Sequence, residues 1–131
     1  MLLKTLIFIF LFTFSIFARA DWNLIYSDKD FSSYLNFSSL QKKGDYLRIW
    51  HLLSFTSSQD IAGTSNFSVK VLLEIDCEGD RSRNLSSIWH TDVMGKGSIN
   101  HSSYFPTDWK NNSPQTLSKY LWFVMCAKPF I

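Results

Sequence analysis

The sequence predicts an α+β fold in which a C-terminal helix is clamped onto a β-sheet. The first observation is the alternation in residues 68–77, where one face of an extended strand would carry Val69, Val71, Leu73, Ile75 and Cys77. The second is the spacing of apolar residues in 114–127, which recur at three- and four-residue steps. The third is that the two cysteines of the chain end these two segments. A strand with one apolar face must bury it, and the helix is the expected cover.

Residues 1–20 have the features of a secretory signal peptide. Lys4 gives a positive start, residues 5–17 are uncharged and largely apolar, and Ala18-Arg19-Ala20 is a small-x-small cleavage site. The domain is therefore expected to span residues 21–131, beginning at Asp21. The apolar core is shorter than the roughly 20 residues that cross a bilayer, and no cysteine follows it for lipid attachment. No stable membrane anchor is expected after cleavage.

The charge of the expected mature domain is balanced. The whole chain has 13 basic and 11 acidic residues, and removal of Lys4 and Arg19 leaves 11 of each. A neutral domain offers no electrostatic reason to bind nucleic acid or an anionic membrane.

The cysteines predict a disulfide. Compartments outside the cytoplasm are oxidising, so Cys77 and Cys126 most simply form one bond. A thiol or metal site would call for a close Cys-x-x-Cys pair, which the sequence lacks. Closing a loop of roughly 50 residues is expected to stabilise the fold by about 4 kcal/mol.

The first half of the domain is expected to contain three strands. Residues 21–28 and 31–37 are predicted strands joined by an Asp28-Lys29-Asp30 turn. Residues 38–40 are expected to form a brief helical turn, followed by a loop. Residues 46–55 are rich in aromatic and branched side chains on both faces, which predicts a central strand covered on both sides.

The second half is expected to continue the sheet. Residues 56–66 are polar and lack periodicity, so they are predicted to form a mobile loop before the strand 68–77. Polar residues 78–81 predict a tight reversal into a strand over 83–94, which implies an antiparallel hairpin. The remaining predicted elements before the helix are a turn at 95–97, an edge strand at 98–104 and a loop at 105–112 that holds Trp109.

The predicted helix over 114–127 starts at Ser113-Pro114. The serine hydroxyl can cap the first amides, and proline already has a helical φ. The competing interpretation is a strand, because residues 120–125 form an unbroken apolar run.

One acidic segment imitates part of a calcium-binding loop. Asp76, Glu78 and Asp80 have the spacing of its first ligands. However, Arg81 stands where the loop requires glycine and Ser87 where it requires a bidentate glutamate. The three carboxylates are therefore expected to be solvated turn residues, and no metal site is predicted.

No other motif passes the spacing tests for catalysis or cofactor binding. His90 and Asp92 lie two residues apart on one predicted strand face, where an exposed polar surface is favoured over a metal ligand or base. Gly95-x-Gly97 lacks the third glycine of a dinucleotide site, so no cofactor is expected. The tryptophans are predicted to pack in the core and at its edge rather than in a ligand groove: Trp22, Trp50, Trp89, Trp109 and Trp122.

The order of these features resembles the bacterial surface-adhesin protein E family. The resemblance is carried by Trp22-Asn-Leu-Ile-Tyr, Tyr34-Leu35-Asn36, Lys43-Gly44-Asp45-Tyr46-Leu47-Arg48-Ile49-Trp50, Asp76-Cys77, Arg83, Leu85-Ser86-Ser87, Met94-Gly95-Lys96-Gly97, Trp109, Ser113-Pro114 and Val124-Met125-Cys126. It implies an antiparallel sheet of about six strands with a C-terminal helix tethered to it by one disulfide. It also implies residence outside the cytoplasm and binding of host extracellular proteins.

The predicted function is therefore an exported, non-enzymatic binding domain, in the periplasm or at the cell surface, for an extracellular or envelope protein. A homodimer is left open. Because loops on a rigid scaffold often hold recognition residues, the predicted contacts are Ser57, Ser58, Asp60, Lys96, Tyr104 and Phe105. The alternative is a small extracytoplasmic hydrolase or metal-dependent enzyme that uses His90, Asp92 and His51.

Overall fold

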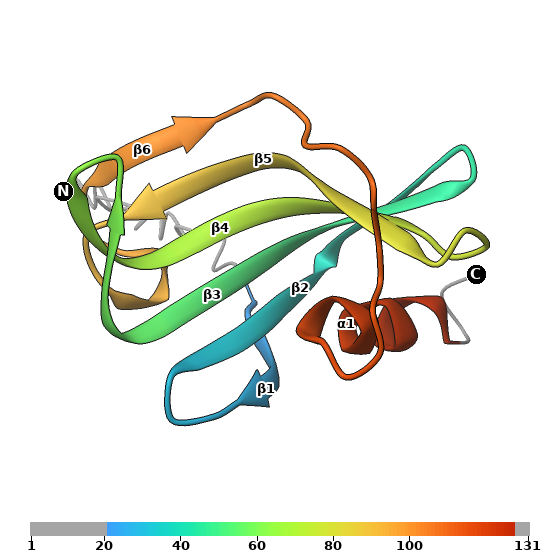
Figure 1. Cartoon of the computed structure of the whole chain (residues 1–131), viewed down its shortest axis with the longest axis horizontal. Coiled ribbons are helices and arrows are strands. Elements are labelled where there is room, and N and C mark those ends of the chain that lie inside the picture. The colour runs from blue at the N-terminus through green and yellow to red at the C-terminus, as the bar shows by residue number, and fades with distance from the viewer. Residues whose placement is uncertain (1–20, 128–131) are drawn as a thin grey trace, which may run out of the picture.

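The computed structural model describes residues 21–127, which form an antiparallel sheet with a helix packed against one face (Figure 1). The elements are β1 (Asn23–Ser27), β2 (Phe31–Lys43), β3 (Tyr46–Ile61), β4 (Thr64–Asp76), β5 (Arg81–His90), the 3-10 helix η1 (Val93–Gly95), β6 (Ile99–Ser103), β7 (Lys110–Asn111) and α1 (Leu117–Cys126). The spatial order runs from β1 to β6 as in the sequence, and β7 pairs with the start of β5. The predicted fold class is confirmed. The predicted signal peptide, residues 1–20, lies outside the described residues.

The core lies between α1 and the face of the sheet that shows the predicted alternation. Leu47 and Ile49 of β3 pair with Ile75 and Leu73 of β4, so that all four point toward the helix. The buried apolar cluster consists of Leu35, Leu47, Ile49, Leu73, Ile75, Leu121 and Met125. The strand over 46–55 is central, as predicted, because β3 lies between β2 and β4. It is not covered on both sides along its whole length, because Trp50 is only half-buried on the face opposite α1.

Helix α1 begins later than the sequence predicts. Its N-cap is Thr116, whose hydroxyl accepts a hydrogen bond from the Lys119 N–H, and not Ser113. Gln115 has φ +62°, a left-handed conformation that a helix cannot include, so the turn at Pro114 is separated from the helix. From Leu117 onward the predicted periodicity holds, and a helix, rather than the competing strand, packs on the sheet.

The predicted disulfide is confirmed. Cys77 and Cys126 are bonded, with their α-carbons 5.5 Å apart. The bond joins the chain just after β4 to the last residue of α1, and therefore ties the helix to the central part of the sheet.

The segment 56–66 is not the predicted mobile loop. It forms the ends of β3 and β4, which pair from Gln59–Asn66 to Ile61–Thr64 around a tight turn. Ala62 and Gly63 both have positive φ, which is typical of a two-residue hairpin turn. The hairpin is polar on both faces, so it shows no apolar periodicity although it is a strand.

The predicted helical turn at 38–40 is also wrong. These residues belong to β2, at an irregularity where Asn36 pairs with Trp50 and Gln41 with Arg48. The Ser39 hydroxyl donates to the Asn36 carbonyl and accepts from the Trp50 N–H, which satisfies backbone groups that the broken ladder leaves free.

The face of the sheet opposite α1 carries a buried carboxylate. Glu74 is fully buried and forms ion pairs with Arg48 at 2.7 Å and Arg83 at 2.8 Å. Trp109 closes this end of the face, because the guanidinium groups of Arg81 and Arg83 lie 4.6 and 4.4 Å from its ring centroid. The loop 105–112 is thus held by cation–π contacts and by β7.

Candidate functional site

Three of the predicted contact residues lie together at one end of the sheet. Ser57, Ser58 and Asp60 are exposed on β3, close to its hairpin with β4. The Ser58 and Ser65 hydroxyls bond across the hairpin. Asn100 of β6 donates to the Ser65 carbonyl at 3.1 Å, which ties the hairpin to the edge strand.

Lys96 lies beside this end of the sheet, directly after η1, and is exposed. Two serine hydroxyls of the sheet hold the turn that presents Lys96. Ser54 accepts from the Met94 N–H at 3.0 Å, and Ser68 accepts from the Gly95 N–H at 2.8 Å. Lys96 is therefore displayed on an ordered turn.

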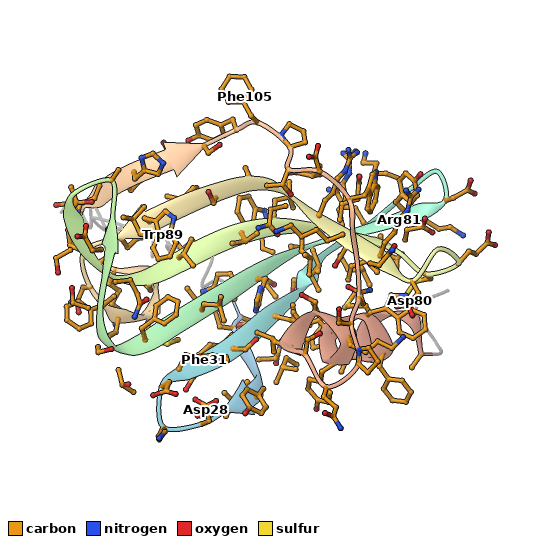
Figure 2. The ribbon with its side chains drawn as sticks, in the orientation of Figure 1. Asp28, Phe31, Asp80, Arg81, Trp89 and Phe105 are labelled. Carbon is orange, nitrogen blue, oxygen red and sulfur yellow. A yellow bond between two sulfur atoms is a disulfide. The ribbon has the colours of Figure 1, made fainter. Side chains whose placement is uncertain are left out.

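Tyr104 and Phe105 follow β6, with exposed fractions of 70% and 84%. Figure 2 shows Phe105 pointing away from the sheet. Sequence reasoning missed a third exposed apolar residue, Ile99, which is 60% exposed at the start of β6. The sequence does contain a signal for this residue, because Ile99 is an isolated apolar residue in a polar edge strand. Exposed apolar groups therefore mark both ends of β6.

The outer backbone of β6 is unpaired within residues 21–127. The strand is last in the spatial order and pairs with β5 from Ser87–Ser103 to His90–Ile99. An edge strand with free N–H and C=O groups is a template for pairing with another chain. The exposed apolar residues lie beside that template.

The residues of the predicted hydrolase do not converge. His51 faces α1, while His90 pairs with Ser68 on the opposite face of the sheet. Asp92 does not share a strand face with His90, because β5 ends at His90 and the Asp92 carboxylate caps η1 by accepting from Val93 N–H at 2.7 Å. The catalytic alternative is not supported.

Both histidines are buried rather than exposed. The His51 Nε2 lies 2.7 Å from the Ser33 hydroxyl, and burial lowers the pKa of His51 from 6.5 to about 4. Burial and the nearby Lys70 also lower the pKa of His90. Neither ring nitrogen of His90 has a hydrogen-bond partner among the described residues; the Gly97 backbone is close but outside hydrogen-bonding geometry. The predicted exposed polar face at His90 is therefore wrong.

Contrary to the prediction, Asp76, Glu78 and Asp80 are not all solvated turn residues. Asp76 accepts from the Gly79 N–H at 3.0 Å and from Arg81 Nε at 2.8 Å, and these bonds lower its pKa. Asp80 pairs with Lys119 of α1, and that hydrogen bond is the main cause of its lowered pKa. Among residues 21–127, no three His, Cys, Asp or Glu side chains gather as metal ligands.

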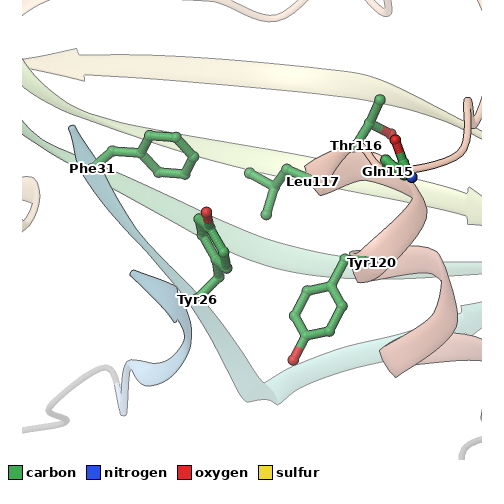
Figure 3. A pocket seen from close by; sticks show the side chains of 6 residues that line it. All are labelled: Tyr26, Phe31, Gln115, Thr116, Leu117 and Tyr120. Carbon is green, nitrogen blue, oxygen red and sulfur yellow. The ribbon is translucent and has the colours of Figure 1, made fainter. Parts of the chain in front are cut away.

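A hollow of about 460 Å³ separates α1 from the β1–β2 hairpin, and Figure 3 shows the side chains that line it. Its walls are Tyr26, Phe31, Gln115, Thr116, Leu117 and Tyr120. The Tyr26 hydroxyl donates to Asp28 at 3.0 Å, which places a negative charge beside it. The amino-terminal end of α1 brings a partial positive charge. No sequence motif marks this hollow, because it depends on the packing of α1 against the β1–β2 hairpin.

No helix in the described part of the chain is both long and apolar enough to cross a membrane.

Comparisons with known proteins identify the family. The model of the family described as surface-adhesin protein E matches residues 22–127. No curated protein matches the sequence. The fold is similar to that of protein E from Haemophilus influenzae. Crystal form II has a TM-score of 0.65 at 10% identity and covers 82% of this chain and 88% of that one.

Two further structures of the same protein agree. The selenomethionine form has a TM-score of 0.61 at 11% identity, covering 83% of this chain and 91% of that one. Protein E from non-typeable Haemophilus influenzae has a TM-score of 0.57 at 10% identity, covering 79% and 74%.

Proposed function

The chain belongs to the surface-adhesin protein E family, and on that premise we propose that it is an exported, non-enzymatic domain that binds an extracellular or envelope protein. The bound partner docks along β6. The hairpin end of the sheet, with Ser57, Ser58 and Asp60, and the turn at Lys96 extend the contact surface.

The observation that carries this proposal is the exposed apolar edge. Ile99, Tyr104 and Phe105 expose more than half of their surface next to the free backbone of β6. Burying one such side chain against a partner is worth about 1.5–3 kcal/mol. Backbone pairing along the strand would add affinity without demanding a particular partner sequence, while the aromatic pair would supply selectivity.

The expected export of the chain is consistent with the same proposal. Cleavage after Ala20 would release residues 21–131 with balanced charge, so that contact with a partner relies on apolar area and hydrogen bonds more than on long-range attraction. We place the product at the cell surface or in the periplasm.

A binding screen tests the proposal. The product purified from cells that express the full-length chain would be immobilised and titrated with extracellular-matrix and envelope proteins by surface plasmon resonance. We expect saturable binding of at least one of them, weakened in the Ser57→Ala/Ser58→Ala/Asp60→Ala variant. Sedimentation equilibrium of the purified product alone tests whether a second copy of the chain, and not a foreign partner, docks at the same edge. The proposal fails if no protein binds.

A further inference from the structure

The face of the sheet opposite α1 is open at its centre. Its ends are covered, by η1 over Ser54 and Ser68 and by Trp109 over Arg81 and Arg83. Between them, one row of side chains runs through the register pairs Asn36–Trp50, Trp50–Leu72 and Leu72–Ser86. No helix covers this row in the described part of the chain.

A shallow groove of about 230 Å³ lies on this open face. It is lined by Trp22, Asn36, Trp50, Lys70 and Ile88. Both tryptophans are half-buried and lie outside the apolar core cluster. Trp22 and Trp50 therefore line a groove, which is the arrangement that the sequence favours less than packing in the core and at its edge.

The groove carries a positive charge that nothing in residues 21–127 neutralises. The Lys70 ammonium group has no hydrogen-bond or ion-pair partner there. Its stem is held in place by η1, because a Cβ added to Gly95 would lie 2.4 Å from Lys70 Cε. The nearest buried carboxylate on the same face, Glu74, is already paired with Arg48 and Arg83. An anionic group on a ligand would complement this charge.

The other lining groups restrict the class of ligand. An indole ring packs well against the C–H face of a sugar ring, because that face is apolar and its hydrogens carry a slight positive charge. The Asn36 amide nitrogen has no partner among the described residues, and an amide can donate to a hydroxyl. Neighbouring flat rings, an amide and an ammonium suit a sugar that bears a carboxylate.

We propose that this groove binds an acidic carbohydrate, with sugar rings against Trp22 and Trp50, a hydroxyl bonded to Asn36 and a carboxylate paired with Lys70. The site is separate from the β6 edge, so it stands or falls independently of the proposed protein-binding function.

Nuclear magnetic resonance of the product purified from cells that express the full-length chain tests the site. The indole N–H signals of the five tryptophans are followed during titration with a hyaluronan hexasaccharide, which alternates a carboxylate-bearing sugar with a neutral one. We expect the signals of Trp22 and Trp50 to shift and those of Trp109 and Trp122 to stay. A neutral chitin hexasaccharide should bind about tenfold more weakly, since it cannot form the charge-assisted bond to Lys70.

Substitutions test whether Lys70 pairs with the carboxylate of the sugar. Lys70→Gln keeps the side-chain stem beneath Gly95 and should weaken the acidic sugar about tenfold, without weakening the neutral one. Lys42→Gln, at an exposed lysine outside the groove, is the matched control and should change neither affinity. Trp22→Ala lies near the expected amino terminus, where it does not disturb the core, and should weaken both sugars.

The proposal is overturned if the acidic and neutral sugars bind equally, or if Lys70→Gln and Lys42→Gln have the same effect. Tighter binding of adenosine monophosphate than of the hexasaccharide would assign the groove to nucleotides instead. Absence of any shift at Trp22 and Trp50 with wild-type protein would show that the groove is not a carbohydrate site.

Discussion

The His51 Nε2 lies 2.7 Å from the Ser33 hydroxyl, in a buried pair beneath α1. The pKa of His51 is about 4 when folded and 6.5 at its ordinary value. Well above pH 6.5, this ring is neutral in both the folded and the unfolded state. As the pH falls from 6.5 to 4, the unfolded chain becomes protonated first, so the free energy of unfolding decreases by up to about 3 kcal/mol and then levels off.

Urea unfolding between pH 7 and pH 4 measures this loss. His51→Asn removes the titrating imidazole and should reduce the proton uptake on unfolding by about one proton. His90, whose pKa is also lowered by burial, contributes to the remaining loss. His101→Asn, at an exposed histidine, is the matched control. Equal pH dependence in the wild type and His51→Asn would contradict the assignment.

The disulfide should be a major source of stability. Cys77→Ala/Cys126→Ala removes a bond between residues 49 positions apart, which is expected to cost about 4 kcal/mol of unfolding free energy. Thermal unfolding measures the effect, and reduction of the wild type should reproduce it. A melting temperature unchanged by the double substitution would show that the bond does not clamp α1.

Glu74 should be more important for stability than an exposed carboxylate. Glu74→Gln leaves Arg48 and Arg83, which are 36% and 27% exposed, without their shared carboxylate, which is expected to cost about 1–3 kcal/mol. Asp80→Asn, whose partner Lys119 is at the surface, should cost much less. Equal urea unfolding midpoints for Glu74→Gln and Asp80→Asn would contradict a larger role for Glu74.

The expected export signal can be tested directly. Mass spectrometry of the protein from its native host should find a chain that begins at Asp21. Replacing Ala18 and Ala20 by tryptophan should block cleavage, because the processing site accepts small residues. A native product that still contains residues 1–20 would refute the expected processing.

Much of the fold is predictable because its core strands have one apolar face. Alternation identified the strands at 46–55 and 68–77, and the cysteines identified the attachment of α1. Periodicity fails where both faces of a strand are polar, as in 56–66, where backbone pairing and the Ala62–Gly63 turn determine the structure. It fails again at Ser39, whose hydroxyl stabilises an irregular strand that resembles a helical turn in sequence.

The surface sites are less predictable than the core. Tyr104 and Phe105 could be selected because aromatic residues in a polar, loop-rich segment lack an obvious place in the core. Trp22 and Trp50 could not, because an aromatic residue in a strand has the same local sequence pattern on a covered face and on an open one. Only the position of α1 decides which face is open.

The most direct test of the central claim is the affinity of a partner from the binding screen for the Tyr104→Ala/Phe105→Ala variant. The account predicts a loss of at least about tenfold, because both rings are proposed to be buried by the partner beside β6. Phe123→Ala, at a phenylalanine that is 64% exposed on α1, should bind like the wild type. Wild-type affinity in the double variant, or an equal loss in Phe123→Ala, would contradict binding along the β6 edge.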